Sequence, residues 1–83
     1  GAAATVLMRA EDAAARGVRP LARIVAHATQ SQAPEWFTTA PVGAIEKVLR
    51  KAGWSVADVD LFEVNEAFAS VAMAPMKDLG IAH

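Results

Sequence analysis

The sequence predicts an α/β fold with parallel strands. Three short apolar runs that contain β-branched residues alternate along the 83-residue chain with three segments of helical pattern. When strands alternate with helices, right-handed crossovers join the strands and make neighbouring strands parallel. Ligands of such sheets collect beyond the carboxyl ends of the strands, beside the first turn of the next helix. These strand-to-helix junctions are therefore the first places to look for a site.

The N-terminal part predicts a strand, a helix and a second strand. The run "ATVLM", Ala4 to Met8, suits a short strand. The segment "EDAAARG" that follows has acidic residues in its first turn and Gly17 just past its end, which is typical of a helix. Residues 21–29, "LARIVAHAT", form the second predicted strand, and a loop rich in amides, hydroxyls and prolines comes next.

The middle of the chain predicts an amphipathic helix and a short turn. The helix begins near Pro41 and ends before Gly53, because proline suits a first helical turn and glycine suits the position after the last one. Its charged face is expected to be solvated, and its apolar face consists of Val42, Ile45, Leu49 and Ala52. Ser55 to Asp58 can cap a single turn before the third predicted strand, residues 61–64.

The last predicted helix, Glu66 to Leu79, is apolar around nearly its whole circumference. Such a helix is expected to be buried and to need cover on more than one side. Pro75 lies inside it and has no amide to donate to the carbonyl of Val71. We therefore expect a kink or an early end at Pro75.

Composition excludes several classes of protein. Hydrophobic residues make up 54% of the chain, although a chain of this size buries only about 60% of its unfolded surface, so we expect a piece of a larger protein. A net charge of -1 gives no electrostatic footprint for nucleic acid or an acidic membrane. No apolar run approaches the roughly 18 residues of a membrane helix, and no signal peptide is recognisable, which favours a soluble intracellular protein.

The residue types also limit the chemistry. With no cysteine, these residues hold no disulfide, thiolate metal site or cysteine nucleophile. The two histidines lack the spacing of metal ligands, so no metal site is predicted.

The stretch "LFEVNEAFA", residues 61–69, places an amide and a carboxylate at the junction between the third strand and the last helix. Asn65 can cap the helix through its side-chain oxygen, and Glu66 suits the helix dipole. The alternative is a functional role, because the carboxyl end of a strand is where ligands bind. The local pattern alone leaves both interpretations open.

Several motifs resemble the thiolases, most closely those of the short-chain acetyl-CoA acetyltransferase type. They are "GAAATVLM", "PLARIV", a Pro-x-x-Phe-x-x-Ala-Pro loop, "KAGWSVADVDLFEVNEAFA" and "KDLG", in this order over essentially the whole chain. The resemblance implies a thiolase fold of two similar halves stacked as αβαβα layers. It places residues 1–20 at the end of the N-terminal half and residues 21–83 at the start of the C-terminal half.

The resemblance also implies an activity. Thiolases cleave 3-ketoacyl-CoA with coenzyme A, or run in the reverse direction as a Claisen condensation of two acetyl-CoA, through an acylated cysteine. Both family cysteines and the histidine of the family's Gly-His-Pro motif fall outside the matched region, so the 83 residues alone are not expected to catalyse. The alternative is a thiolase-like protein that binds acyl-CoA without condensing anything.

Four residues match functional positions of the family. Asn65 matches an asparagine that holds a water, which joins a histidine in the oxyanion hole for the thioester enolate. Ala67 and Phe68 match positions that line the passage for the pantetheine arm, with core packing as the alternative. Phe37 matches a position in the acyl pocket where many relatives carry Met and the branched-chain-accepting type carries Phe.

The resemblance further implies coenzyme A as a substrate, with no bound cofactor. The expected partners are an acyl-CoA, the remainder of a thiolase chain and further copies in a homodimer or homotetramer, with neither nucleic acid nor membrane. The expected location is the cytoplasm, or the mitochondrion or peroxisome in a eukaryote.

Overall fold

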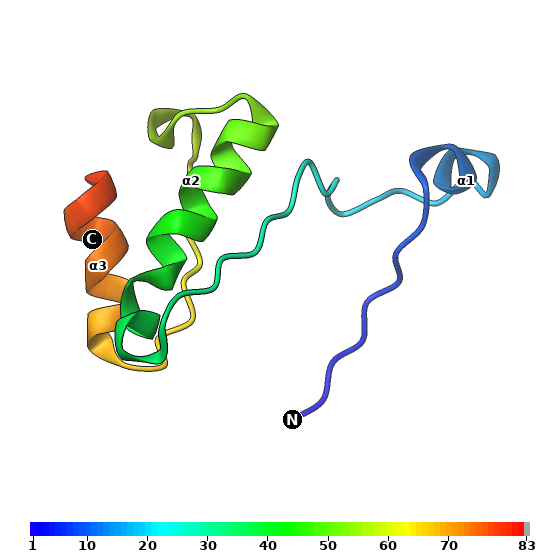
Figure 1. Cartoon of the computed structure of the whole chain (residues 1–83). Helices are drawn as coiled ribbons and strands as arrows, with labels where there is room; N and C mark the ends of the chain where they lie inside the picture. Colours follow the sequence, from blue (N-terminus) through cyan, green and yellow to red (C-terminus); the bar gives the residue numbers. More distant parts are fainter. Residues whose placement is uncertain (83) are drawn as a thin grey trace.

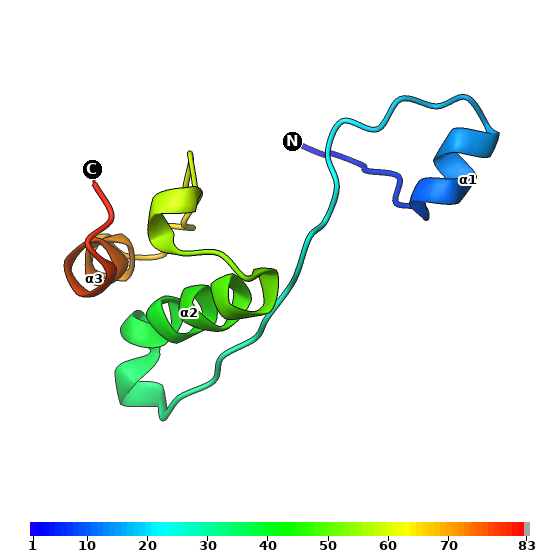
Figure 2. The same cartoon turned by 90° about the horizontal axis from the view of Figure 1, so that it is seen from above.

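The computed structural model describes residues 1–82, and His83 lies outside the described residues. The described part contains α1 (Ala10–Ala15), η1 (Pro34–Thr39), α2 (Ala40–Ala52), η2 (Val56–Asp58) and α3 (Ala69–Leu79), where η denotes a 3-10 helix. Helices α2 and α3 lie side by side and both contact η1 (Figure 1). Helix α1 lies away from them in both views, at the end of a long open segment (Figures 1 and 2).

The three predicted strands do not form among residues 1–82. Residues 4–8, 21–29 and 61–64 run as open traces with no strand pairing, and Leu21 and Leu61 are almost fully exposed. A strand is defined by hydrogen bonds to a neighbouring strand, and none of the three lies beside another in that way. The strand prediction is therefore wrong for these residues taken by themselves.

Helix α1 forms as predicted. Arg9 precedes it and makes ion pairs with Glu11 at 2.8 Å and with Asp12 at 3.0 Å, so the acidic first turn is partly neutralised. Gly17 follows the helix with a left-handed φ of 65°, which a residue with a side chain rarely adopts.

Helix α2 also has the predicted ends. Pro41 lies in its first turn, and Gly53 ends it with a φ of 72°. The amide of Trp54 then donates to the carbonyl of Leu49 at 3.0 Å, which satisfies one of the carbonyls left free at the helix end.

The sequence predicts that the charged face of α2 is solvated, but two of its lysines also bind another segment of the chain. Lys51 Nζ donates to the carbonyl oxygen of His27 at 3.0 Å, and Lys47 Nζ donates to that of Thr29 at 3.4 Å. These two lysines attach the open segment 27–29 to α2. They supply donors to carbonyls that a strand partner would otherwise satisfy.

The turn η2 confirms the predicted cap. The backbone N–H and the side-chain hydroxyl of Ser55 both donate to Asp58 Oδ2 at 2.7 Å. The backbone N–H bond is the main cause that lowers the pKa of Asp58 from its ordinary value, and the hydroxyl bond adds to it.

Helix α3 differs from its prediction at its start and in its burial. It begins at Ala69, three residues later than expected, because Phe68 is extended with φ -145° and ψ 153°. It continues past Pro75 to Leu79, so the expected early end is wrong. Only Val71 and Pro75 are buried, whereas Met73 remains exposed. Ala72, Ala74, Met76 and Leu79 are half-buried, so the described part of the chain covers this apolar helix only in part.

The chain exposes more surface than a self-contained fold of its mass. Its accessible surface is 7093 Å², against about 4,700 Å² expected for a folded monomer of this size. The radius of gyration is 15.7 Å, against roughly 12 Å for a compact domain. Within the described residues, no helix is long and apolar enough to cross a membrane.

Candidate functional site

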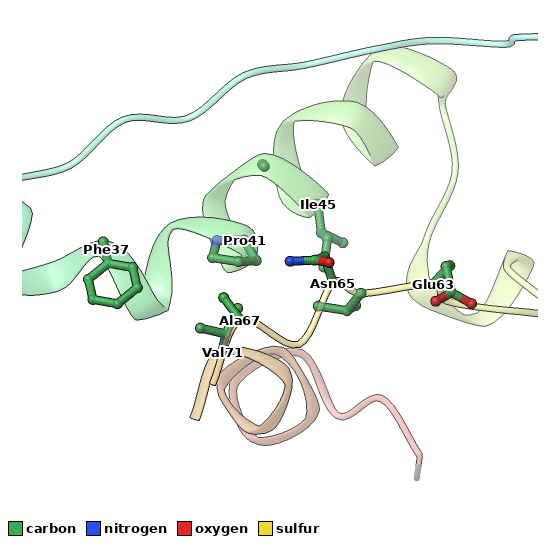
Figure 3. Close-up of a pocket in the computed structure, with 9 residues that line it drawn as sticks. Phe37, Pro41, Ile45, Glu63, Asn65, Ala67 and Val71 are labelled. Atoms are coloured by element: carbon green, nitrogen blue, oxygen red, sulfur yellow. The ribbon is translucent and has the colours of Figure 1, made fainter. Parts of the chain in front are cut away.

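A shallow pocket lies where η1, the start of α2 and the residues before α3 meet (Figure 3). Its volume is about 390 Å³. Its lining is mostly apolar and consists of Phe37, Pro41, Ala44, Ile45, Glu63, Val64, Asn65, Ala67 and Val71. The pocket therefore brings together segments that are some thirty residues apart in the sequence.

Asn65 contributes the amide of this pocket, and its side chain lies beside Ile45 and Pro41 (Figure 3). The predicted capping role is wrong, because α3 begins four residues later and no side chain caps it. The carbonyl of Asn65 instead accepts from the amide of Ala67 at 3.1 Å, which makes a tight turn before the helix. This turn holds the Asn65 backbone while its side chain stays exposed in the pocket.

Phe37 and Ala67 line the same pocket as Asn65. Phe68 lies outside the lining, but its ring packs edge-on against Phe37, with the ring centroids 6.1 Å apart and an interplanar angle of 68°. Such an aromatic pair stabilises by about 0.5–1.5 kcal/mol beyond the area it buries. The four residues singled out from the sequence thus form one cluster that joins η1 to the start of α3.

Sequence reasoning missed several lining residues. Glu63 brings the only carboxylate to the described pocket, and Pro41, Ala44 and Val71 complete its apolar wall. Ile45 belongs to the apolar stripe of α2, but the stripe does not reveal which segment covers it. Glu66, named beside Asn65 in the sequence, does not line the pocket.

The chemistry of the site is that of an amide in an apolar setting. Among residues 1–82, no group of three or more His, Cys, Asp or Glu side chains could hold a metal ion. An amide can donate two hydrogen bonds and accept two without changing its charge. The pocket therefore suits a ligand with an apolar part and a polar oxygen near Asn65.

Comparison with known proteins identifies the family. Residues 18–83 match the family described as "Thiolase, C-terminal domain", which is most of the chain. The chain belongs to the thiolase family. The resemblance drawn from the sequence motifs is thereby confirmed.

Relatives of this thiolase chain match it almost from end to end. It is 56% identical over 80 residues to an acetyl-CoA acetyltransferase of Rhizobium meliloti (strain 1021), covering 96% of this chain and 20% of that protein. It is 49% identical over 81 residues to a cytosolic acetyl-CoA acetyltransferase of Mus musculus, covering 98% of this chain and 20% of the mouse protein. The chain therefore spans about a fifth of the length of these relatives.

A solved structure supports the fold. The crystal structure of the Bacillus anthracis acetyl-CoA acetyltransferase matches with a TM-score of 0.85 and 41% sequence identity, over 90% of this chain and 19% of that one. The prediction that the chain is a segment of a thiolase fold is thus confirmed. The division into residues 1–20 and 21–83 stays a prediction.

Proposed function

We propose that this chain is part of a thiolase that catalyses the coenzyme A-dependent cleavage of a 3-ketoacyl-CoA, or the reverse condensation of two acetyl-CoA. The observation that carries the proposal is the cluster of Asn65, Ala67 and Phe37 around one apolar pocket. Its support is the similarity to proteins named acetyl-CoA acetyltransferase over nearly the whole chain. The enzyme is an acyltransferase, and its remaining residues supply the nucleophile.

Asn65 has the role of orienting a donor toward developing negative charge. Removal of a proton beside a thioester carbonyl moves charge onto the carbonyl oxygen, and a fixed neutral donor stabilises that oxygen in the transition state. The turn that precedes α3 fixes the backbone of Asn65, and the apolar wall strengthens any hydrogen bond formed there. Asn65 acts through a water in this proposal, as in the family it resembles.

Phe37, Ala67 and Phe68 have the role of contacting the acyl group and the pantetheine arm. Small and aromatic apolar surfaces suit both of these ligand parts. Coenzyme A enters as a substrate, and no bound cofactor is needed. We also propose that the full-length enzyme works in the cytoplasm, the location in the name of the mouse relative, and assembles as a homodimer or homotetramer.

The test is the Asn65→Ala variant of the full-length protein that contains this chain. Loss of an oxyanion donor should lower kcat by about 10²-fold or more, with a smaller effect on KM. The neighbouring Glu66→Ala variant is the control, since Glu66 does not line the pocket. A fall in unfolding temperature with unchanged kcat would show that Asn65 only supports the fold.

The alternative, a thiolase-like protein that binds acyl-CoA without condensing it, makes a different prediction. Such a protein would bind acetyl-CoA in calorimetry and yet neither form nor cleave acetoacetyl-CoA. Measurement of binding and of both reaction directions on the full-length protein separates the two functions.

A further inference from the structure

A ring of three hydrogen bonds closes around the 3-10 helix η1. Gln32 Nε2 donates to the carbonyl oxygen of Trp36 at 2.7 Å and to Thr39 Oγ1 at 2.8 Å. Thr39 Oγ1 in turn donates to the same Trp36 oxygen at 3.0 Å. The ring joins residues seven positions apart in the sequence and ties the segment before η1 to the last residue of that helix.

The three bonds use both N–H donors of the Gln32 amide and the single donor of the Thr39 hydroxyl. The Thr39 hydroxyl also accepts once. The Trp36 carbonyl oxygen accepts from both side chains. A carboxylate at position 32 could not replace the amide, because it has no donor at neutral pH. An apolar side chain at position 39 would remove two of the three bonds.

Two residues of the hydrogen-bond ring, Trp36 and Thr39, lie before and after Phe37 in the sequence. Their bonded groups are the Trp36 carbonyl and the Thr39 hydroxyl. Phe37 is half exposed and is the residue through which η1 reaches the pocket. The Phe37 ring packs edge-on against Phe68 and is half exposed, so the backbone on either side contributes to fixing its position.

We propose that Gln32 and Thr39 are positioning residues that fix the Phe37 ring in the acyl pocket and thereby set the discrimination between branched and unbranched acyl groups. The proposal rests on the proposed function, in which Phe37 contacts the acyl group. Neither Gln32 nor Thr39 lines the pocket that holds Asn65. They act by holding η1 in one conformation, so that the phenyl ring of Phe37 keeps one position in the pocket.

The experiment uses the full-length protein and the ratio of kcat/KM for 2-methylacetoacetyl-CoA over acetoacetyl-CoA. Gln32→Met and Thr39→Val keep the size of each side chain but remove its hydrogen bonds. Each should change the ratio by about three- to tenfold, less than the roughly 10- to 200-fold that a whole methyl group is worth in an apolar pocket. The double variant should change the ratio no more than the single ones, because all three bonds belong to one ring.

Thr39→Ser is the matched control, since it keeps the hydroxyl, and its ratio should stay within about twofold of the wild type. Gln32→Glu keeps the shape but not the donors and should behave like Gln32→Met. An unchanged ratio in Gln32→Met and Thr39→Val would overturn the proposal, whatever their unfolding temperatures. So would a Thr39→Ser variant that behaves like Thr39→Val.

Phe37→Met separates this proposal from the one on which it rests. If Phe37→Met changes the ratio and Gln32→Met does not, the positioning role is wrong and the pocket assignment stands. If Phe37→Met leaves the ratio unchanged, the pocket assignment is wrong and the positioning role is overturned with it. A wild-type protein that turns over neither substrate overturns the proposed enzymatic function as well.

Discussion

Phe37 is the pocket residue whose proposed contact with the acyl group can be tested by a substrate preference. It lines the pocket and packs edge-on against Phe68. If its ring contacts the acyl group, Phe37→Met should change the kcat/KM ratio for 2-methylacetoacetyl-CoA over acetoacetyl-CoA by about tenfold, because one methyl group in an apolar pocket is worth roughly 1–3 kcal/mol. Steady-state kinetics of the full-length protein with both substrates measure this ratio.

Trp36 provides the control for Phe37. It is the adjacent aromatic residue, it is exposed, and it does not line the pocket. Trp36→Phe should therefore leave the substrate ratio unchanged. Equal losses of kcat/KM on both substrates in Phe37→Met would mean that Phe37 only supports η1.

At this scale the residues proposed for the site come from resemblance rather than from local rules, and their roles stay predictions. The local pattern left a helix cap and a functional role open for Asn65, and the cap failed because an extended Phe68 delays the start of α3. Glu63 could not be found, since a lone carboxylate in an apolar run has no distinctive spacing. The ring of Gln32 and Thr39 was also missed, because a side-chain contact seven residues apart in a loop follows no periodicity.

At the scale of elements, helix ends were predictable and strands were not. The ends of α1 and α2 follow from Pro41, Gly17 and Gly53, whose effects act within one turn of the chain. The strands depend on partners far away in the sequence, so an apolar run gives only the tendency to extend. Residues 21–29 illustrate this, since two lysines of α2 supply bonds that a neighbouring strand would make.

The turn η2 gives a prediction about pH. The lowered pKa of Asp58 means that the ionised carboxylate is favoured in the folded chain. Its contribution to stability is therefore fully present above the ordinary value of 3.8 and is lost as the pH falls through the lowered pKa. Asp58→Asn should lower the unfolding temperature of the full-length protein at about pH 6 and have a smaller effect at about pH 3.

Asp60→Asn is the control for that experiment, because it removes the same charge two residues after Asp58, outside the hydrogen bonds to Ser55. It should show no comparable loss at either pH. A deficit in Asp58→Asn that is the same at both pH values would mean that the side chain matters for its shape and not for its ionised form.

At the scale of the whole molecule, a second apolar pocket shows which apolar side chains the described residues leave exposed. It runs along α2 with a volume of about 250 Å³, between that helix and two open segments. It is lined by Val25, Ala26, Ile45, Val48, Leu49, Ala52, Trp54, Val59, Leu61, Phe62 and Glu63. These residues include parts of two predicted strands, so the uncovered pocket and the missing sheet have one cause. Both depend on contacts that the described residues do not supply to one another.

This uncovered surface predicts how the 83 residues behave when they are prepared alone. Among residues 1–82, only Ala13, Val71 and Pro75 are buried, and a core of that size cannot offset the roughly 1–2 kcal/mol of backbone entropy lost for each ordered residue. We expect thermal unfolding followed by circular dichroism to be broad and without a cooperative transition. We also expect no thiolysis of acetoacetyl-CoA, because the chain has no cysteine nucleophile. A single sharp transition would mean that α2 and α3 form an independent folding unit, and turnover that survives removal of contaminating enzyme would mean that other residues carry the reaction.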